Sequence, residues 1–309
     1  MKNILGIISS QKEKSYASFY EREATEFYDE ILYIDPKRVE YTIRRGENTP
    51  EIVYDGYILN NLSMVYVLSP PLGTWNHTIL LVKYLLAAGC PISDTFEMLR
   101  RDGIGKAYEA LASQKNVGTT CYIATSLAAG TSIIEKLAEE SYPLVTKPTY
   151  GHHGKGIYKI DNAQEALHHL QQHFMDSKDF LILEKFIIYT KEWRVYVVDG
   201  DIIGSYGKSA LPGSFIANLH QGAQTKPAEP MDEIYEFIKA HLPSECRQGI
   251  YGLDVGLSAN GEIHVIETNR CPGWKGLQSS KINFPYEANK ILFKRARQYT
   301  QEPANEKIG

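Results

Sequence analysis

The sequence IYGLDVGLSANGEIHVIETNRCPG, residues 250–273, contains two alternating apolar runs on either side of Asn260-Gly261. This dipeptide is favoured in the type I′ turn of a two-residue β-hairpin, because both central residues take a positive φ. Counting back from such a turn along both strands places Asp254 opposite Glu267. Asn269, two residues farther on, shares that face because successive side chains of a strand alternate. The segment therefore predicts a hairpin with Asp254, Glu267 and Asn269 on one face.

Facing carboxylates at Asp254 and Glu267 need a compensating cation, because like charges directly opposite one another destabilise a sheet. The three side chains offer only oxygen donors, without His or Cys, and this set suits Mg²⁺ or Mn²⁺ rather than zinc. Leu253, Val255 and Ile266 indicate that both strands are partly buried, which raises the cost of bare carboxylates. The sequence thus predicts a metal site, and the alternative is a surface hairpin with two solvated acids.

A second motif, KPTYGHHGKGI at 147–157, follows the end of a predicted strand. Its glycines and lysines are Gly151, Gly154, Gly156, Lys147 and Lys155. Glycines let backbone amides approach an anion closely and the lysines add positive charge, so a polyphosphate is the natural ligand. The motif is no Walker A loop, because GxxxxGK[ST] is missing and a strand pattern rather than a helix follows. The alternative is a surface turn in which His152 and His153 are ordinary exposed histidines.

A third motif, LILEKFIIYTKEWRVYVVDG at 181–200, has two apolar strands with a polar interruption between them. The residues that link the strands are Glu184, Lys185, Phe186 and Ile187. Their backbone can hydrogen-bond the edge of an adenine in an apolar slot, and Glu192 can reach ribose hydroxyls. Arg194 faces the same side as Glu192, two residues away. The alternative for this last pair is a surface salt bridge.

Composition limits the function classes further. A chain of 309 residues with 43% hydrophobic and 23% charged residues is typical of a folded protein with two or three subdomains. A net charge of −4, from 33 basic and 37 acidic residues, argues against a general nucleic-acid binder. The four cysteines form no CxxC pair, which predicts neither zinc site nor disulfide framework and suggests the cytoplasm. The apolar runs at 4–8 and 78–89 are too short for a signal peptide or a membrane span.

Hydrophobic periodicity predicts the remaining elements. The N-terminal part is expected to hold strands at 3–9, 30–35 and 55–61 and helices at 17–29 and 78–88. The central part is expected to hold helices at 104–115 and 131–140 and a strand at 143–148. Strands dominate from residue 178, with helices at 231–241 and 284–299. The expected division is an α/β domain at 1–94, a central subdomain with the glycine-rich loop at 95–185, and a C-terminal subdomain with the metal site at 186–309.

The order of the motifs resembles that of the ATP-grasp superfamily. The glycine-rich loop, the Glu-Lys-Phe-Ile linker, GSFIANLHQGA at 213–223 and the Asp…Glu-x-Asn hairpin follow one another as in the RimK-like carboxylate–amine ligases. The similarity covers roughly residues 95–280, whereas the first 90 residues share only a general α/β character. The resemblance implies an α/β fold in which two α+β lobes clamp ATP, after an N-terminal pre-ATP-grasp domain.

The resemblance also implies roles for individual residues. Lys147 matches a lysine that contacts the nucleotide phosphates, and Lys106 is the candidate for a second one although its register differs by two or three residues. Residues 184–187 would bind adenine and Glu192 the ribose. Arg194 and Asn218 would act at the phosphate end, beside Mg²⁺ or Mn²⁺ held by the three hairpin residues.

The implied activity is ATP-dependent formation of an amide or peptide bond through an acylphosphate, with release of ADP and phosphate. The expected partners are ATP, a carboxylate and an amine, either of them a small molecule or a peptide, without nucleic acid or membrane, in a homodimer. Ile216 and Gln221 replace basic residues of the ligase pattern, so an acidic substrate is not implied, and Arg270 is a candidate to bind anions instead. The alternatives are a small-molecule kinase of the same superfamily and a non-catalytic nucleotide-binding module.

Overall fold

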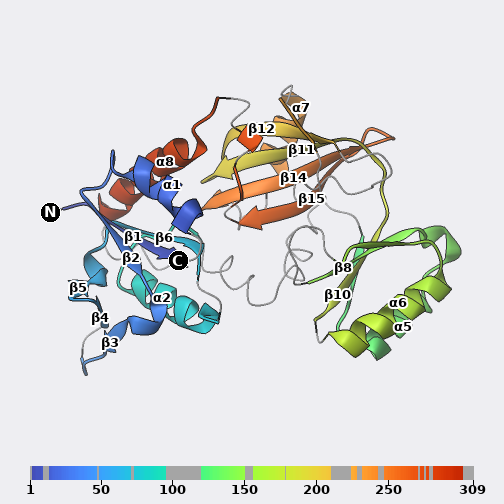
Figure 1. Ribbon diagram of the computed structural model, residues 1–309, viewed down its shortest axis with the longest axis horizontal. Helices are drawn as coiled ribbons and strands as arrows, with labels where there is room; N and C mark the ends of the chain where they lie inside the picture. Colours follow the sequence, from blue (N-terminus) through green and yellow to red (C-terminus); the bar gives the residue numbers. More distant parts are fainter. Residues whose placement is uncertain are drawn as a thin grey trace.

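The fold is built from three β-sheets and a small additional one, as seen in the computed structural model (Figure 1). The structure describes residues 2–9, 14–46, 49–70, 73–94, 120–149, 156–177, 179–209, 224–227, 232–242, 247–270, 272–274, 276–277 and 281–301. The predicted helix at 104–115 lies outside these residues. No helix among the described residues has both the length and the apolar character needed to cross a membrane.

The N-terminal part contains a parallel sheet in the order β2-β1-β6 and a small antiparallel sheet, β3-β4-β5. Its elements are β1 (Ile4–Ser9), α1 (Lys14–Ala24), β2 (Glu30–Ile34), β3 (Glu40–Thr42), β4 (Glu51–Tyr54), β5 (Tyr57–Ile58), β6 (Met64–Ser69) and α2 (Trp75–Ala87). Alternate residues of β1 point to opposite faces of the sheet, as strand geometry requires. Leu5 and Ile7 pack with α1, whereas Ile8 packs with α2.

The predicted strand at 55–61 is wrong. Asp55 has a φ of 47° in a turn, only residues 57 and 58 form β5, and the 3₁₀ helix Leu59–Asn61 follows. One of the strands that the sequence analysis missed is β6, MVYVLS, which is buried on both faces beside β1. A doubly buried parallel strand reads as a continuous apolar run and lacks the alternation that was used to find strands.

The central part contains an antiparallel sheet in the order β7-β10-β8-β9, with two helices packed on one face (Figure 1). Its elements are β7 (Cys121–Ala124), α5 (Leu127–Ile134), β8 (Leu144–Pro148), β9 (Tyr158–Ile160), α6 (Ala163–Asp176) and β10 (Leu181–Lys185). The predicted helix at 131–140 is displaced toward the N-terminus. Ser126 caps α5 by accepting a hydrogen bond from the Ala129 N–H (3.2 Å), so the helix begins and ends earlier.

The C-terminal part contains a five-stranded antiparallel sheet in the order β13-β12-β11-β14-β15. Its elements are β11 (Tyr189–Val198), β12 (Asp201–Ser209), β13 (Gln224–Pro227), α7 (Asp232–His241), β14 (Ile250–Ser258), β15 (Ile263–Arg270) and α8 (Phe284–Gln301). Trp193, Val195, Leu253 and Val255 pack against α7 on one face of the sheet. The opposite face is therefore available for polar side chains along β11 and β14.

The β14–β15 hairpin has the predicted pairing but not the predicted turn. Only Gly261 has a positive φ (86°), and its N–H donates to the Ser258 carbonyl (3.1 Å), so the loop has three residues rather than two. This loop shifts the register by one residue, and a bulge at Ile266 shifts it back. Asp254 consequently lies opposite Glu267, as predicted, because the two departures cancel.

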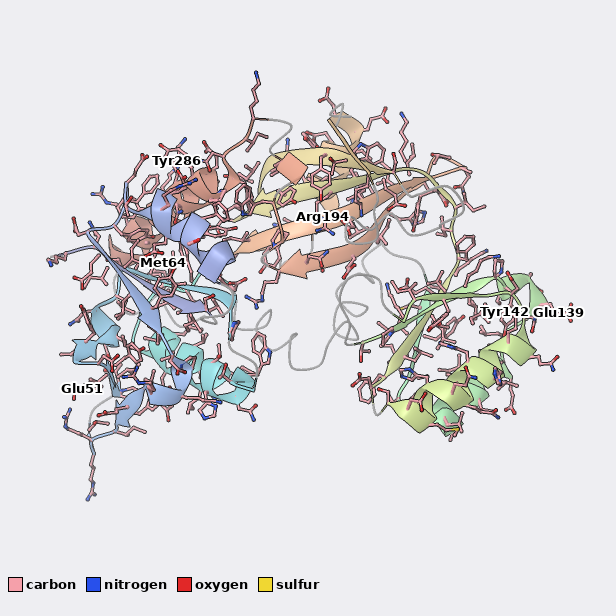
Figure 2. The ribbon with its side chains drawn as sticks, viewed as in Figure 1. Glu51, Met64, Glu139, Tyr142, Arg194 and Tyr286 are labelled. Atoms are coloured by element: carbon pink, nitrogen blue, oxygen red, sulfur yellow. The ribbon has the colours of Figure 1, made fainter. Side chains whose placement is uncertain are left out.

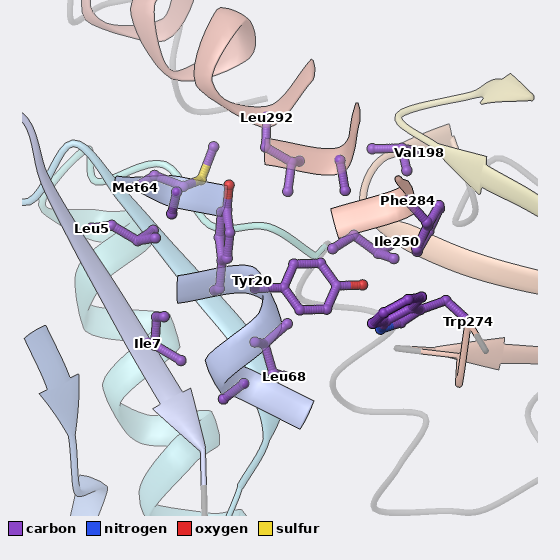
Figure 3. Packing of buried hydrophobic residues seen from close by; sticks show 14 of the residues in the cluster. Leu5, Ile7, Tyr20, Met64, Leu68, Val198, Ile250, Trp274, Phe284 and Leu292 are labelled. Carbon is purple, nitrogen blue, oxygen red and sulfur yellow. The ribbon is translucent and has the colours of Figure 1, made fainter. Parts of the chain in front are cut away.

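One hydrophobic core joins the N-terminal sheet to the C-terminal sheet (Figure 3). Tyr20 of α1 lies beside Trp274, Ile250 and Phe284, and α8 returns from the end of the chain to pack against α1. Within the described residues, the central sheet has a separate hydrophobic cluster with α5 and α6. The fold is thus a mixed α/β one in which the C-terminal helix completes the N-terminal layer.

Candidate active site

Five of the predicted site residues lie on the polar face of the C-terminal sheet: Glu192, Arg194, Asp254, Glu267 and Asn269. On β11, Glu192 pairs with Lys208 of β12, and Arg194 pairs with Asp254 of β14. The sequence neighbours of Glu192, Arg194 and Asp254 pack against α7 on the other face, which fixes the direction of these three side chains. Lys208 is placed on the same face by its contacts with Glu192 and Asp254. Figure 2 shows Arg194 in the middle of this sheet. The register of three strands therefore gathers two acids and two bases at one place.

Asp254 is the centre of this group. The Arg194 Nε donates to its Oδ1 (2.5 Å) and the Arg194 Nη2 to its Oδ2 (2.6 Å), while Lys208 Nζ lies 3.1 Å from Oδ1. Burial by itself would raise the pKa of Asp254, but Lys208 and Arg194 outweigh it and lower the pKa to about 2. The carboxylate is thus fully ionised and is held between two cations.

Two glycines make this packing possible. A Cβ on Gly252 would lie 2.6 Å from Pro272 Cβ and 3.0 Å from Arg194 Cδ, so only glycine lets the arginine lie along β14. A Cβ on Gly256 would lie 2.4 Å from the ring of Tyr189, the first residue of β11. Gly252 and Gly256, on either side of Asp254, therefore leave space over β14 for the side chains of Arg194 and Tyr189.

Glu267 and Asn269 stand on β15, next to Asp254. Glu267 is opposite Asp254 in the register, and Asn269 is opposite Gly252. The Asn269 Nδ2 is buried and has no hydrogen-bond partner among the described residues. No cluster of three His, Cys, Asp or Glu side chains that could hold a metal occurs in the described part of the chain. The two carboxylates and the Asn269 Oδ1 are oxygen ligands of the kind that a hard divalent cation takes.

Glu192 is not the exposed partner of Arg194 that a surface salt bridge would require. Its carboxylate lies 3.7 Å from Lys208 Nζ, and both side chains are largely buried. Burial raises the pKa of Glu192, and Lys208 opposes that rise. Glu192 therefore belongs to the same charged group as Arg194, Lys208 and Asp254.

The central sheet carries a second charged pair. Lys147 Nζ on β8 lies 2.7 Å from Glu184 Oε1 on β10. Cys121 of β7 pairs with Glu184 across the sheet. Burial raises the pKa of the Cys121 thiol and the Glu184 carboxylate raises it further, whereas Lys147 lowers it. Two residues predicted to bind the nucleotide, Lys147 and Glu184, are thus in direct contact.

The linker between the two sheets starts at the end of β10. Lys185 is exposed, and Phe186 and Ile187 are half-buried. The Phe186 N–H donates to the Pro143 carbonyl (2.9 Å), and Lys159 Nζ lies 5.3 Å from the centre of the Phe186 ring. These contacts fix one end of the linker on the central sheet.

Tyr189 lies where the linker enters β11. Burial raises the pKa of its hydroxyl, and the carboxylates of Glu184 and Glu192 raise it further. Tyr189 thus stands near acids from both sheets. It was missed by the sequence analysis, as was Lys208. The apolar residues at 202 and 203 indicate a strand after Asp201. The register that brings Lys208 opposite Glu192 is not visible in the sequence.

Several predicted residues cannot be placed. Lys106, Gly151, Gly154, Lys155 and Asn218 lie outside the described residues, as do Ile216 and Gln221. Gly156 is described and has a φ of 77°, at the end of the predicted glycine-rich loop. Arg270, predicted to bind anions, contacts the N-terminal part instead: its Nη1 donates to the Val67 carbonyl and lies 3.8 Å from Asp94.

Comparisons with known proteins give a matching family model and similar chains. The RimK-like ATP-grasp domain model matches residues 104–292. A coenzyme gamma-F420-2:alpha-L-glutamate ligase of Methanococcus maripaludis is 29% identical over 160 residues, covering 50% of this chain and 53% of the relative. A probable alpha-L-glutamate ligase of Shewanella pealeana is 28% identical, covering 77% of this chain and 52% of the relative. The chain thus spans about half the length of these relatives.

Other similar proteins are matched over most of their length. A probable alpha-L-glutamate ligase of Hydrogenovibrio crunogenus is 25% identical, covering 88% of this chain and 89% of the relative. The ATP-grasp ligase PsnB, solved with a minimal precursor, superposes with a TM-score of 0.68 at 14% identity, covering 96% of this chain and 100% of PsnB. D-alanyl-alanine synthetase A of Vibrio cholerae gives a TM-score of 0.64 at 14% identity, covering 96% of this chain and 98% of the synthetase. These structures share the fold of this chain.

Proposed function

Because the chain belongs to the RimK-like ATP-grasp family, we propose that it is an ATP-dependent ligase that joins a carboxylate to an amine. The reaction transfers the terminal phosphoryl group of ATP to the carboxylate, and the amine displaces phosphate from the resulting acylphosphate. The products are an amide, ADP and phosphate. The observation that carries this proposal is the gathering of Arg194, Asp254, Glu267 and Asn269 at adjacent positions on one sheet face.

The residues of the chain divide into two groups in this proposal. Lys147 on the central sheet and Arg194 on the C-terminal sheet would help to hold the phosphates. The linker at 184–187 would receive the adenine and Glu192 the ribose. Lys106, Asn218 and the glycine-rich loop at 150–156 are further candidates, and closure of that loop would keep water from the acylphosphate.

A divalent cation, Mg²⁺ or Mn²⁺, held by Asp254, Glu267 and Asn269 would neutralise charge on the terminal phosphates. Asp254 can serve only if its carboxylate changes partners, because Arg194 and Lys208 occupy it in this structure. The feature that favours such a ligand set is the pairing of Asp254 with Glu267, which brings two carboxylates together with the Asn269 side chain on the same face.

The substrates are proposed by class only. Relatives named alpha-L-glutamate ligases suggest an amino acid or a peptide as one substrate. Ile216 and Gln221 replace basic residues of the ligase pattern, which disfavours an acidic substrate. Cys90 and Cys121 have free thiols, in keeping with a reducing compartment, and we propose the cytoplasm as the site of action. A homodimer stays a prediction.

The proposed function is tested by ADP release. Purified protein with ATP and Mg²⁺ is incubated with pooled carboxylic acids, with and without pooled amines, and new amides are sought by mass spectrometry. A ligase shows phosphate release that depends on the amine and a product with the mass of an amide. A phosphorylated product that forms without amine would instead indicate a kinase, and no nucleotide turnover with any pool would contradict an enzymatic role.

A further inference from the structure

Both oxygens of the Asp254 carboxylate are occupied by cations of the chain. Arg194 donates to each oxygen, at 2.5 and 2.6 Å, and Lys208 approaches Oδ1 at 3.1 Å. An ionised carboxylate has about four lone-pair positions, and three donors leave little room for a further ligand. The side chains of Arg194, Lys208 and Asp254 are only 18%, 5% and 8% exposed, so water cannot readily replace these contacts.

The charges around Asp254 oppose the entry of a metal ion alone. Arg194 and Lys208 both contact the Asp254 carboxylate, and both side chains are largely buried. A divalent cation bound to Asp254 would therefore stand next to two buried positive charges and bring no negative charge to balance them. A polyphosphate that arrives with the metal supplies the missing negative charge, and its oxygens are good acceptors for both cations.

We infer that Arg194 and Lys208 keep the metal site closed in the nucleotide-free protein and that a polyphosphate opens it by an exchange of ion pairs. The two cations turn to phosphate oxygens, and the Asp254 carboxylate turns to the divalent ion. No covalent bond changes in this step. The inference rests on the proposed function, and its consequence is that metal and nucleotide strengthen each other's binding by the same factor.

Lys208 is the residue at which this closure can be tested. Its single ammonium lies between Asp254 (3.1 Å) and Glu192 (3.7 Å), whereas Arg194 holds Asp254 through two parallel hydrogen bonds. Replacing Lys208 removes one cation and still leaves Asp254 paired with Arg194. The substitution Lys208→Met retains an unbranched side chain of similar length, so the space is filled without a charge.

The experiment measures binding of Mn²⁺ by electron paramagnetic resonance, with Mn²⁺ alone and with Mn²⁺ plus AMP-PNP. Wild-type protein should bind Mn²⁺ alone weakly and much more tightly with AMP-PNP. Lys208→Met should bind Mn²⁺ alone at least about tenfold more tightly than wild type, because a buried positive charge beside the ion is gone. The enhancement by AMP-PNP should shrink in the variant.

The matched control is Lys239→Met, which removes the same charge from an exposed position on α7, where Lys239 pairs with Glu236. Lys239→Met should leave the affinity for Mn²⁺ unchanged, both with and without AMP-PNP. An unaltered affinity of folded Lys208→Met for Mn²⁺ alone would overturn the inference.

A measurement on wild type alone keeps the test valid if the variant does not fold. Equal affinity of wild type for Mn²⁺ with and without AMP-PNP would also overturn the inference, while leaving a nucleotide-binding ligase intact. Failure of wild type to bind AMP-PNP even with saturating Mn²⁺ is a different result, and it would refute the proposed function.

Discussion

Asp254 shows how neighbouring cations stabilise a buried carboxylate. Removing an ion from water is costly, and this cost is offset only where partners of opposite charge are well placed. Arg194 and Lys208 meet this condition from two different strands. A ligand of the Asp254 carboxylate would therefore have to displace the same contacts with Arg194 and Lys208 that stabilise its charge.

We predict that Asp254→Asn lowers the free energy of unfolding at neutral pH by about 3 kcal/mol, because it leaves two buried cations without their shared anion. Urea unfolding measures this change. Asp201→Asn is the control, since Asp201 is exposed at the start of β12 and its loss should cost little. An Asp254 variant as stable as the control would show that the ion pairs contribute nothing to stability.

The low pKa of Asp254 also predicts a pH dependence of stability. Its folded-state pKa is about 2, below the ordinary value of 3.8, so the unfolded chain takes up the proton first as the pH falls. The stabilisation is complete above about pH 4 and declines toward pH 2, by about 2 kcal/mol in total. Urea unfolding of wild type and Asp254→Asn over this range should show the decline in wild type alone. An equal loss of stability in wild type and Asp254→Asn would show that other acidic residues cause it.

At the scale of elements, the β14–β15 hairpin shows that a correct pairing does not require a correct turn. The loop at residues 259–261 is one residue longer than predicted, and the bulge at Ile266 restores the pairing of Asp254 with Glu267. A bulge at Ile203 has a similar effect in β12, where it brings Lys208 rather than Gly207 opposite Glu192. Bulges thus decide which charges meet on the polar face.

We predict that Gly256→Ala destabilises the protein by about 1 to 3 kcal/mol, because the new Cβ would lie 2.4 Å from the Tyr189 ring. Gly273→Ala is the control, since a Cβ there has no heavy atom within 4 Å. Adding Tyr189→Ala should relieve the clash, so the double variant should lose less stability than the sum of the two single ones. Strict additivity in urea unfolding would contradict the proposed contact.

At the scale of the whole molecule, the first and last elements of the chain form one layer. Asn289 of α8 is fully buried, accepts a hydrogen bond from the Tyr66 hydroxyl (2.9 Å) and donates to the Tyr20 carbonyl (3.0 Å). Arg270 reaches from β15 to Val67 and to the face of the Trp75 ring. The N-terminal and C-terminal sheets are therefore expected to unfold together.

We predict that Asn289→Leu lowers the free energy of unfolding by about 1 to 3 kcal/mol, because it leaves the buried Tyr66 hydroxyl without its acceptor. The double variant with Tyr66→Phe should recover part of this loss, since both polar partners are then removed. Heat denaturation should show one transition for both sheets. Separate transitions for the N-terminal and C-terminal sheets would contradict a shared core.

The sequence by itself determined the chemistry of the candidate site and its place in the chain. Strand alternation is a local property, so it put Asp254, Glu267 and Asn269 on one face, and the order of the motifs indicated the family to which the chain belongs. The apolar helix α2 and the amphipathic helix α8 were also found, because helical periodicity is local as well.

Only the tertiary structure decided which cations hold Asp254 and where α8 packs. The position of Lys208 depends on a bulge, and the return of α8 to α1 depends on a core shared by residues more than 200 positions apart. Contacts of this kind arise from the packing of distant segments, and no pattern within a single element encodes them. For that reason the sequence could place the three proposed metal ligands on one face, whereas it could not reveal the ion pairs of Asp254 with Arg194 and Lys208.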